Sequence, residues 1–369
     1  MISFNIPFIC GEEENFIHEA INEKNLSGDG HFTKLCQKEL VAFTKASNIL
    51  LTSSCTHALE LSALLCDIKP GDEIIMSSFT FVSSANAFVL RGAKIVFVDI
   101  DPVTMNIDEN LIESAITKKT KAILVMHYAG VSCAMDQIMA IAKKNDLFVI
   151  EDAAQCIDAY YHQKHLGTIG HLGAFSFHAT KNIHCGEGGA LLVNDERLVN
   201  RAEIIREKGT NRKLFFKGKV DKYTWVDIGS SYLLSEISTA FLYAQIQKIK
   251  QVTQRRLHYW EIYKKELGFL NPNTISPDLK HNAHIFYIKC SDKDQRSDLI
   301  QYLKSRSIKS AFHYVPLHSS PAGKLFGRFH GEDKYTTIES ERLLRLPLFY
   351  DLKEIDQVID SVKQYFQDL

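Results

Sequence analysis

The sequence predicts an α/β protein with a mostly parallel sheet, and three patterns indicate it. Between about residues 48 and 152, short apolar runs alternate with helical patterns. The apolar runs are continuous, which is typical of parallel strands covered on both faces. After residue 194 the pattern becomes helical, and from about residue 272 strand-like and helical runs alternate. We therefore expect a large cofactor-binding domain over residues 1–250 and a smaller C-terminal α+β domain over residues 251–369.

The elements follow from these runs in order along the chain. Strands of the large sheet are expected at NILLTSS (48–54), EIIMSS (73–78), KIVFVDID (94–101), AILVMHYAG (122–130), FVIEDAA (148–154), GAFSF (173–177) and ALLV (190–193). The intervening segments and the long stretch 230–267 are expected to be helical. In the C-terminal part, HIFYIKC (284–290), DLIQYLKSRS (298–307) and SAFHYVPLH (310–318) indicate the α+β domain.

The charge balance argues against nucleic acid and membranes as partners. The 43 basic and 44 acidic residues give a formal net charge of −1, and no basic run stands out. No apolar run approaches the roughly 20 residues that span a bilayer, and the N-terminus turns acidic too early for a signal peptide. The eight cysteines form no C-x-x-C pair, and the histidines show no H-E-x-x-H spacing. We therefore expect reduced thiols, no metal site and a cytoplasmic protein.

Polar residues cluster where the predicted strands end, and ligands of parallel sheets bind at that edge. TSSCT (52–56) ends one strand and opens a helix, whose first N–H groups carry a partial positive charge. Ser54, Cys55 and Thr56 are therefore candidate ligands of a phosphate. The alternative is an ordinary N-cap without a ligand.

Asp152 and Lys181 point to one cofactor. Asp152 directly follows a buried strand, where a carboxylate needs a cationic partner or hydrogen-bond donors. Lys181 lies in GAFSFHATKNIHCGEGGALLVND (173–195) with little cationic company. Pyridoxal phosphate needs both residues, the lysine for its aldehyde and the carboxylate for its ring nitrogen. Ser176 would join the phosphate ligands, and Phe81 would lie on the ring. An N-cap or a salt bridge for Asp152 and a solvated Lys181 are the alternatives.

Two other activities are rivals to this interpretation. A cysteine hydrolase is conceivable because a thiol at a helix N-terminus has a lowered pKa and His57 lies close to Cys55 in sequence. No third group that would orient His57 is evident. A nicotinamide-dependent enzyme is the weaker rival, because GEGG (186–189) does not follow a strand and open a helix.

The motifs around these residues resemble those of the DegT/DnrJ/EryC1/StrS aminotransferases. The resemblance covers nearly the whole chain and is carried by SSCTHALEL (53–61), SSFTFVSSANAFVLRGAKIVFVDID (77–101), EDAAQ (151–155) and residues 173–195. It implies a fold-type-I transferase that depends on pyridoxal 5′-phosphate, acts on nucleotide-linked keto sugars, and forms a homodimer with shared active sites. Related dehydratases carry histidine in place of the lysine, so Lys181 favours transamination.

The resemblance also implies which part of the cofactor each residue touches: Lys181 the aldehyde, as a Schiff base, Asp152 the ring nitrogen, Gln155 the phenolic oxygen, Phe81 the ring face, and Cys55, Thr56 and Ser176 the phosphate. GSSYL (229–233) departs from the G-x-N-x-R of many relatives. Ser231 therefore replaces an asparagine that reaches the cofactor phosphate of the partner subunit, and the shorter serine leaves that contact open.

Further segments resemble the branch of this family that aminates C4 of dTDP-linked sugars. They are LSGDGHFTKLCQKEL (26–40), HYAGVSCAMD (127–136), VDKYTWVDIGSSYLLSE (220–236) and ESERLLRLPLFY (339–350). They imply L-glutamate as the donor and dTDP-4-keto-6-deoxy-D-glucose as the acceptor. The products would be 2-oxoglutarate and dTDP-4-amino-4,6-dideoxy-D-galactose, a precursor of enterobacterial common antigen or lipopolysaccharide. The gluco epimer, amination at C3 and a non-catalytic cofactor-binding sensor stay open.

Two segments are expected to contact the sugar nucleotide. REKGTNRKLFFKGKVDKYTW (206–225) mixes basic residues, Lys217 among them, with aromatic ones, and FHYVPLH (312–318) adds histidines. Tyr223 and His313 are the favoured sugar-side contacts, and a solvated charged loop is the alternative. Lys181 would move a proton between the substrate carbon and C4′ of the cofactor.

Overall fold

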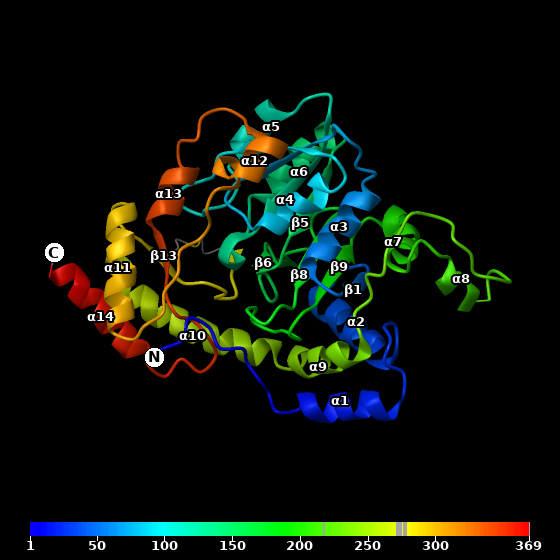
Figure 1. The fold of residues 1–369 in the computed structure, drawn as a ribbon, viewed down its shortest axis with the longest axis horizontal. Helices are drawn as coiled ribbons and strands as arrows, with labels where there is room; N and C mark the ends of the chain where they lie inside the picture. Colours follow the sequence, from blue (N-terminus) through cyan, green and yellow to red (C-terminus); the bar gives the residue numbers. More distant parts are fainter. Residues whose placement is uncertain (217, 271–274, 276–278, 369) are drawn as a thin grey trace.

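A computed structural model describes residues 1–216, 218–270, 275 and 279–368, and it confirms the expected α/β fold (Figure 1). An eight-stranded sheet has the order β1-β9-β8-β5-β4-β2-β3-β12. Its strands are β1 (Ile49–Thr52), β2 (Glu73–Ser77), β3 (Lys94–Val98), β4 (Thr120–Met126), β5 (Phe148–Asp152), β8 (Leu172–Ser176), β9 (Gly189–Val193) and β12 (Gly327–Phe329). Smaller sheets contain β6 (Tyr160–Tyr161), β7 (Lys164–His165) and β10 (Leu279–Lys280), and β11 (Tyr287–Lys289) and β13 (Leu343–Arg345).

The large sheet is parallel except at β9. β9 pairs antiparallel with both β1 and β8, whereas the pairs from β8 across to β12 are parallel. The carboxyl ends of the parallel strands therefore meet at one edge, together with the start of β9. Successive side chains alternate between the faces, so Ile74 and Met76 lie in one core and Ile75 in another.

Helices cover both faces of this sheet (Figure 1). On one face lie α3 (Cys55–Leu65), α4 (Val82–Val89) and α7 (Val199–Arg206). On the other lie α2 (His31–Thr44), α5 (Ile112–Ala115), α6 (Met135–Lys144) and α9 (Glu236–Ile246), with α1 (Glu13–Asn22) packed outside α2 and α9. The apolar residues of β2 to β5 are buried on both faces, as continuous apolar runs predict.

A second core joins α10 (Ile249–Leu267), α11 (Lys293–Ser305) and α14 (Ile355–Gln367) to β11 and β13. The remaining helices are α8 (Arg212–Phe216), α12 (Pro321–Phe326) and α13 (Thr336–Arg342), and 3₁₀ turns cover Glu109–Leu111, Tyr128–Gly130, Glu196–Leu198, Gly268–Leu270 and Leu317–Ser319. Two segments cross between the predicted domains: β12 pairs with β3, and Ile2 bridges to Ile308. The division at residue 250 stays a prediction.

The helical pattern of residues 230–267 predicts one helix, but the structure contains two helices there. Ser235 has extended backbone angles and caps α9, because its hydroxyl accepts the N–H of Ser238 at 3.3 Å. α9 then ends at Ile246, and Lys248 bonds back to the carbonyl of Gln245 at 3.0 Å before α10 begins. A serine cap at Ser235 and a two-residue turn at residues 247–248 thus divide an otherwise helical pattern.

All eight cysteines carry free thiols. Within the described ranges, none of the helices combines the length and apolar character that crossing a bilayer requires.

The buried carboxylate of Glu236 fixes the start of α2 against α9. It accepts the N–H groups of Gly30, Phe32 and Thr33 at 3.0, 2.7 and 3.2 Å, and the Thr33 hydroxyl as well. A Cβ at Gly30 would lie 2.6 Å from Glu236 Cδ, so glycine is needed for this approach. The carboxylate satisfies the first amides of a helix that is more than 200 residues away in sequence.

We expect Glu236→Gln to lower the free energy of unfolding by about 2 to 3 kcal/mol, because the amide presents donors to backbone donors and leaves them unsatisfied. Urea unfolding followed by circular dichroism would measure the change. The exposed Glu261→Gln is the matched control and should unfold like the wild type. An equally stable Glu236→Gln would mean that this carboxylate does not hold α2.

Candidate active site

A cavity of about 790 Å³ lies at the carboxyl edge of the large sheet. Most of the candidate residues line it, and they come from distant segments because β1, β5 and β8 all end at this edge. The predicted residues that line it are Ser54, Cys55, Thr56, Phe81, Asp152, Gln155, Ser176, Lys181 and His313. The structure brings these side chains together, and their individual roles stay predictions.

The first turn of α3 presents free donors to the cavity. Ser54 is the N-cap, and its hydroxyl accepts the N–H of His57 at 3.1 Å. The N–H groups of Cys55 and Thr56 have no acceptor among the residues that the structure describes. A helix start with free amides carries partial positive charge and suits an anion.

The cysteine-hydrolase rival does not hold at Cys55. Burial raises the pKa of the Cys55 thiol well above its usual value, which outweighs the helix N-terminus that was expected to lower it. His57 is engaged elsewhere, because its Nδ1 lies 2.6 Å from the Ser53 hydroxyl. A protonated thiol is a poor nucleophile, so the useful group of Cys55 is its backbone N–H.

The carboxylate of Asp152 is buried at the end of β5 without a cationic partner. Its side chain accepts the hydroxyl of Ser84 at 2.6 Å and the N–H of Ala154 at 3.2 Å. None of the ion pairs between described residues includes Asp152, so the salt-bridge alternative does not apply. A carboxylate held by neutral donors beside a cavity is available to a cationic group of a ligand.

Lys181 lies between β8 and β9, in a loop closed by the Ala179 N–H to Gly186 carbonyl bond at 2.8 Å. Its ammonium has no hydrogen-bond or ion-pair partner in the part of the chain that the structure describes. Burial lowers the pKa of Lys181; the Asp152 charge opposes this shift and the Arg345 charge adds to it. Lys181 thus lines the cavity, which favours the functional interpretation over a solvated surface lysine. An amine with a lowered pKa suits nucleophilic attack and proton transfer better than an ordinary lysine does.

Gln155 and Ser176 are oriented by neighbours and keep capacity for a ligand. Gln155 Oε1 accepts the N–H of Ala129 at 2.6 Å, and its Nε2 donates to the Tyr314 hydroxyl at 3.2 Å. The second hydrogen on that nitrogen has no acceptor among the described residues. The Ser176 hydroxyl accepts the N–H of His178 at 3.4 Å, which leaves its own hydrogen to donate.

One wall of the cavity comes from the C-terminal third and was not predicted, apart from His313 and Tyr314 in the FHYVPLH segment. It contains Arg256, His284, Tyr314 and Arg345. A polar residue inside an apolar run was the available signal, because His284 opens HIFYIKC and Arg345 interrupts LLRLPLF. The predicted α+β segment gave no reason to place these runs against the edge of the large sheet.

The electrostatics of this wall favour an anionic ligand. Burial lowers the pKa of His313 to about 2 and that of His284 well below its ordinary value, so both rings are neutral. Burial also lowers the pKa of Arg256 to about 9, which leaves it charged at neutral pH. Its guanidinium is held by the carbonyls of Ala283 and His284 at 3.0 and 2.8 Å. Arg345 provides a further positive charge.

Tyr223 and Ser231 do not line the cavity. Tyr223 is 54% exposed, and its ring lies 5.9 Å from that of Phe215 in the segment with α8, which projects from the body (Figure 1). Ser231 is exposed and pairs through its backbone with Glu207. Lys217 lies outside the described residues.

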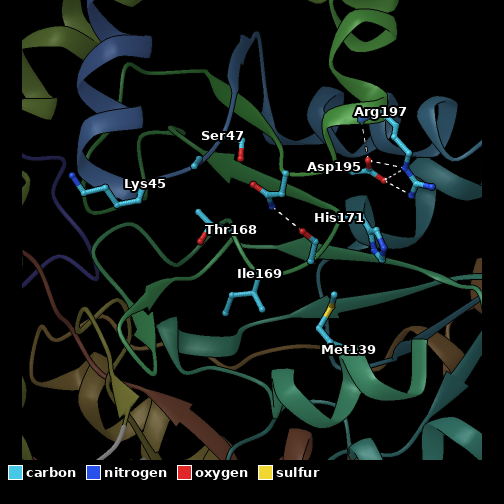
Figure 2. A pocket seen from close by; sticks show the side chains of 11 residues that line it. Lys45, Ser47, Met139, Thr168, Ile169, His171, Asp195 and Arg197 are labelled. Carbon is cyan, nitrogen blue, oxygen red and sulfur yellow. Dashed lines mark hydrogen bonds and ion pairs between the residues drawn. The ribbon is translucent and has the colours of Figure 1, made fainter. Parts of the chain in front are cut away.

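Figure 2 shows another hollow, of about 360 Å³, at the opposite edge of the sheet before β1 and β8. Its polar groups serve the local structure. Arg197 is hydrogen-bonded to Asp195 at 2.6 to 3.1 Å, and the amide of Asn194 donates to the carbonyls of Gly167 and Gly170. This hollow lacks the unpartnered amine and buried acid of the larger cavity, so the latter is the candidate active site.

One group of described residues has spacing suited to a metal ion. Ligand atoms of Glu19, Glu23 and His31 lie within 4.8 Å of one another, and all three residues are exposed. None of them lines the cavity. The expectation of no metal site stays a prediction.

The cavity fits pyridoxal 5′-phosphate by the chemistry of its free groups. Lys181 offers an unpartnered amine, and Asp152 offers a carboxylate without a cation. The free N–H groups at the start of α3 offer a phosphate cradle. Gly189 brings β9 against that cradle, because a Cβ there would lie 2.4 Å from the backbone of Ser54 and Cys55.

Comparisons with known proteins agree with this chemistry. The model of the DegT/DnrJ/EryC1/StrS aminotransferase family matches residues 8–363. The chain is 32% identical over 376 residues to the spore coat polysaccharide biosynthesis protein SpsC of Bacillus subtilis, covering 98% of this chain and 96% of that protein. It is 29% identical over 369 residues to the GDP-perosamine synthase of Escherichia coli O157:H7, covering 98% of each. Among solved structures, Spr1654 from Streptococcus pneumoniae in its PLP form superposes with a TM-score of 0.91 at 25% identity, covering 100% of this chain and 99% of that chain.

Lys181→Ala should abolish the yellow colour of the purified protein, because the covalent attachment of the cofactor is lost. Visible absorption after addition of pyridoxal phosphate measures this. The exposed Lys118→Ala is the matched control and should stay yellow. A visible band that persists unchanged in Lys181→Ala would show that another lysine holds the cofactor.

The pH dependence of cofactor capture should report the charges around Lys181. The rate at which the apoprotein captures the cofactor should rise with pH through a midpoint below the ordinary 10.5 of lysine, because burial disfavours the ammonium. Asp152→Asn should move this midpoint to lower pH, since the carboxylate that favours the ammonium is gone. Arg345→Met should move it to higher pH. Borohydride trapping with mass spectrometry gives the rate, and shifts of the same sign in both variants would contradict this arrangement.

Proposed function

The chain belongs to the DegT/DnrJ/EryC1/StrS aminotransferase family, as its motifs indicate, and from this premise we propose that it aminates a dTDP-linked 4-keto-6-deoxy sugar. It is a sugar aminotransferase, and its cofactor is pyridoxal 5′-phosphate. In the proposed reaction, L-glutamate gives its amino group to C4 of dTDP-4-keto-6-deoxy-D-glucose. The products are 2-oxoglutarate and dTDP-4-amino-4,6-dideoxy-D-galactose, a precursor of cell-surface polysaccharide.

The observation that carries the aminotransfer is that one cavity is lined by the unpartnered amine of Lys181 and by the buried carboxylate of Asp152, which has no cationic partner among the described residues. The Lys181 amine removes a proton from Cα of the donor and delivers it to C4′ of the cofactor, and it works in the opposite direction on C4 of the sugar. Pyridoxal phosphate, when bound, takes up the electron pair that each proton removal leaves behind. The Asp152 carboxylate keeps the ring nitrogen protonated, which stabilises that charge.

The remaining lining residues hold and orient the cofactor in this proposal. The N–H groups of Cys55 and Thr56 and the hydroxyl of Ser176 bind its phosphate. Gln155, fixed by Ala129, contacts its phenolic oxygen, and Phe81 covers the ring face. The residues at the rim of the cavity are partly exposed, so water can enter it in a single chain. A second subunit that covered this edge would exclude that water.

A nucleotide-linked acceptor is supported by charge and by relatives. The cationic C-terminal wall suits the diphosphate of a sugar nucleotide, and His313 on that wall suits a sugar contact. One relative is a GDP-perosamine synthase, and another is a spore coat polysaccharide biosynthesis protein. The dTDP base and the galacto product rest on the four sequence segments that resemble the C4-aminating branch. The gluco epimer and C3 amination are the competing outcomes, and the cytoplasmic location stays a prediction.

The product identifies the reaction. Purified enzyme with L-glutamate and dTDP-4-keto-6-deoxy-D-glucose should yield an axial amine at C4, and NMR coupling constants of the sugar ring would measure it. Reactions without L-glutamate, or with Lys181→Ala, are the controls. An equatorial amine would contradict the galacto assignment alone. Cofactor binding without amine transfer would favour the sensor alternative.

We propose a homodimer in which Tyr223 and Ser231 act on the cavity of the partner. Both lie outside the cavity of their own chain, in or near a projecting segment. This segment exposes several large apolar side chains, as expected of an interface rather than a solvated loop: Phe216, Tyr223, Trp225 and Val226. The charged-loop alternative predicts a monomeric surface there.

Subunit mixing tests this arrangement. A dimer of one Lys181→Ala chain and one Tyr223→Ala chain would have one intact site, made of Lys181 from one subunit and Tyr223 from the other. Equal mixing after unfolding should therefore recover up to about a quarter of wild-type activity for a twofold dimer. Mixing Lys181→Ala with Asp152→Asn is the control and should recover none, because both residues serve the same chain. No recovery in the first mixture would place Tyr223 in its own cavity or outside any site.

A further inference from the structure

Arg345 is a partly buried cation whose donors are almost unused by the described residues. It lines the same cavity as Lys181. Of its five guanidinium N–H groups, one donates to the Phe312 carbonyl, at 3.3 Å. Its Nε is buried and has no hydrogen-bond partner among the described residues. Buried polar groups are normally paired, so the unpaired Nε makes this side chain a candidate to bind a ligand in the cavity.

No acid compensates the charge of Arg345. The described ion pairs do not include it, and its guanidinium lies 4.7 Å from the centre of the Phe4 ring. Burial lowers the pKa of Arg345, and the groups that oppose this shift are the phenols of Tyr128 and Tyr314 rather than carboxylates. By contrast, Arg342 three residues earlier has Glu339 at 3.4 Å and the Cys290 carbonyl at 2.7 Å.

The backbone holds Arg345 in a fixed position. Its N–H donates to the Ala311 carbonyl at 2.8 Å, and its carbonyl accepts the Ala311 N–H at 3.2 Å. It also pairs with Tyr287 in the β11–β13 sheet. The charge of Arg345 acts on Lys181, His284 and His313, which places it among the reacting groups. A preorganised guanidinium of this kind recognises a carboxylate with two parallel hydrogen bonds.

The two substrates of a sugar aminotransferase differ in the charge beside the reacting carbon, which a cation in the cavity can distinguish. An amino acid carries a carboxylate on the carbon that bears its reacting nitrogen. A keto sugar carries no charge near its carbonyl carbon, because its phosphates are attached at the far side of the ring. A cation that shares a cavity with Lys181 therefore distinguishes the donor from the acceptor.

We propose that Arg345 binds a carboxylate of the amino donor and thereby selects an amino acid as donor, leaving the acceptor sugar largely unaffected. This inference rests on the proposed function, because it assumes that donor and acceptor use the cavity in turn. Binding of the sugar nucleotide diphosphate by Arg345 is the competing assignment.

Separate half-reactions test the proposal. Enzyme in the pyridoxal form reacts with L-glutamate, and enzyme loaded with pyridoxamine phosphate reacts with the keto sugar. We expect Arg345→Met to raise the half-saturating L-glutamate concentration about 30-fold or more, as loss of a buried charge partner does. Half-saturation by the keto sugar should change less than about 3-fold, within the range of a lost uncharged contact. Arg345→Lys should fall between Arg345→Met and the wild type, because lysine keeps the charge and loses the bidentate geometry.

Equilibrium binding of glutarate, a dicarboxylate without an amine, gives a readout that needs no turnover. Its affinity for the pyridoxal form should fall in Arg345→Met in parallel with that of L-glutamate. Arg255→Met is the matched control, because Arg255 is exposed and absent from the cavity lining. Melting temperatures of all variants show that each is folded.

The outcomes separate this inference from the proposed function. Equal weakening of both substrates, or unchanged glutarate binding, would overturn the role of Arg345. If the wild type transfers no amine from any amino acid, the proposed function fails. The glutarate titration of Arg345→Met still decides whether the side chain binds a carboxylate.

Discussion

The cavity exists because the C-terminal third is held against the carboxyl edge of the large sheet, and the buried amide of Asn282 is the attachment beside the cavity. Its Nδ2 donates to the carbonyls of Gln155 and Ile157 at 2.8 and 2.7 Å, just after β5 ends. Its Oδ1 accepts the N–H of His284 at 3.1 Å. A Cβ at Gly130 would lie 2.1 Å from that oxygen, so the sheet edge is shaped to receive it. If the C-terminal segment docked in a shifted position, each hydrogen bond that the buried Asn282 amide lost would cost about 1 to 3 kcal/mol. This cost favours a single docking position.

This docking creates the electrostatic character of the site. The wall that Asn282 positions removes water from Lys181, and desolvation is the largest cause of the lowered pKa of that lysine. The same wall adds Arg256 and Arg345, whose charges are costly to bury unless a ligand shares the cavity. Asp152, on the strand side, is screened by hydroxyl and amide donors instead of a cation. The folded chain thus keeps an acid and several cations apart in one cavity, and a ligand with both charges can satisfy them together.

The sequence predicted the strand side of this site and missed most of the docked side. Strand ends meet at one edge in any parallel sheet, so the positions of Ser54, Asp152 and Lys181 follow from local patterns and sheet topology. The docked wall depends on the long-range contacts of Asn282, which no periodicity encodes, so Arg345 and its neighbours could not be placed. The same limit applies to helix boundaries: a pattern that is apolar at helical spacing cannot reveal a serine cap.

The division between the two walls has a consequence for specificity. The strand side is built from backbone groups and from side chains anchored to the sheet, such as Ser84 beneath Asp152. Its geometry is set by the fold and suits a cofactor that is the same in every reaction cycle. The docked side presents His313 and Arg345 from segments that are joined by the backbone pair of Ala311 and Arg345. This side meets the strand side through the Tyr128–His313 and Gln155–Tyr314 hydrogen bonds. Substitutions there alter charge and shape, and a change of the Arg345 charge also acts on the pKa of Lys181. Substrate choice can therefore change on the docked side while Lys181 and Asp152 keep their places on the strand side, and hydrogen bonds such as Gln155 to Tyr314 and Asn282 to Gln155 keep the two walls in register.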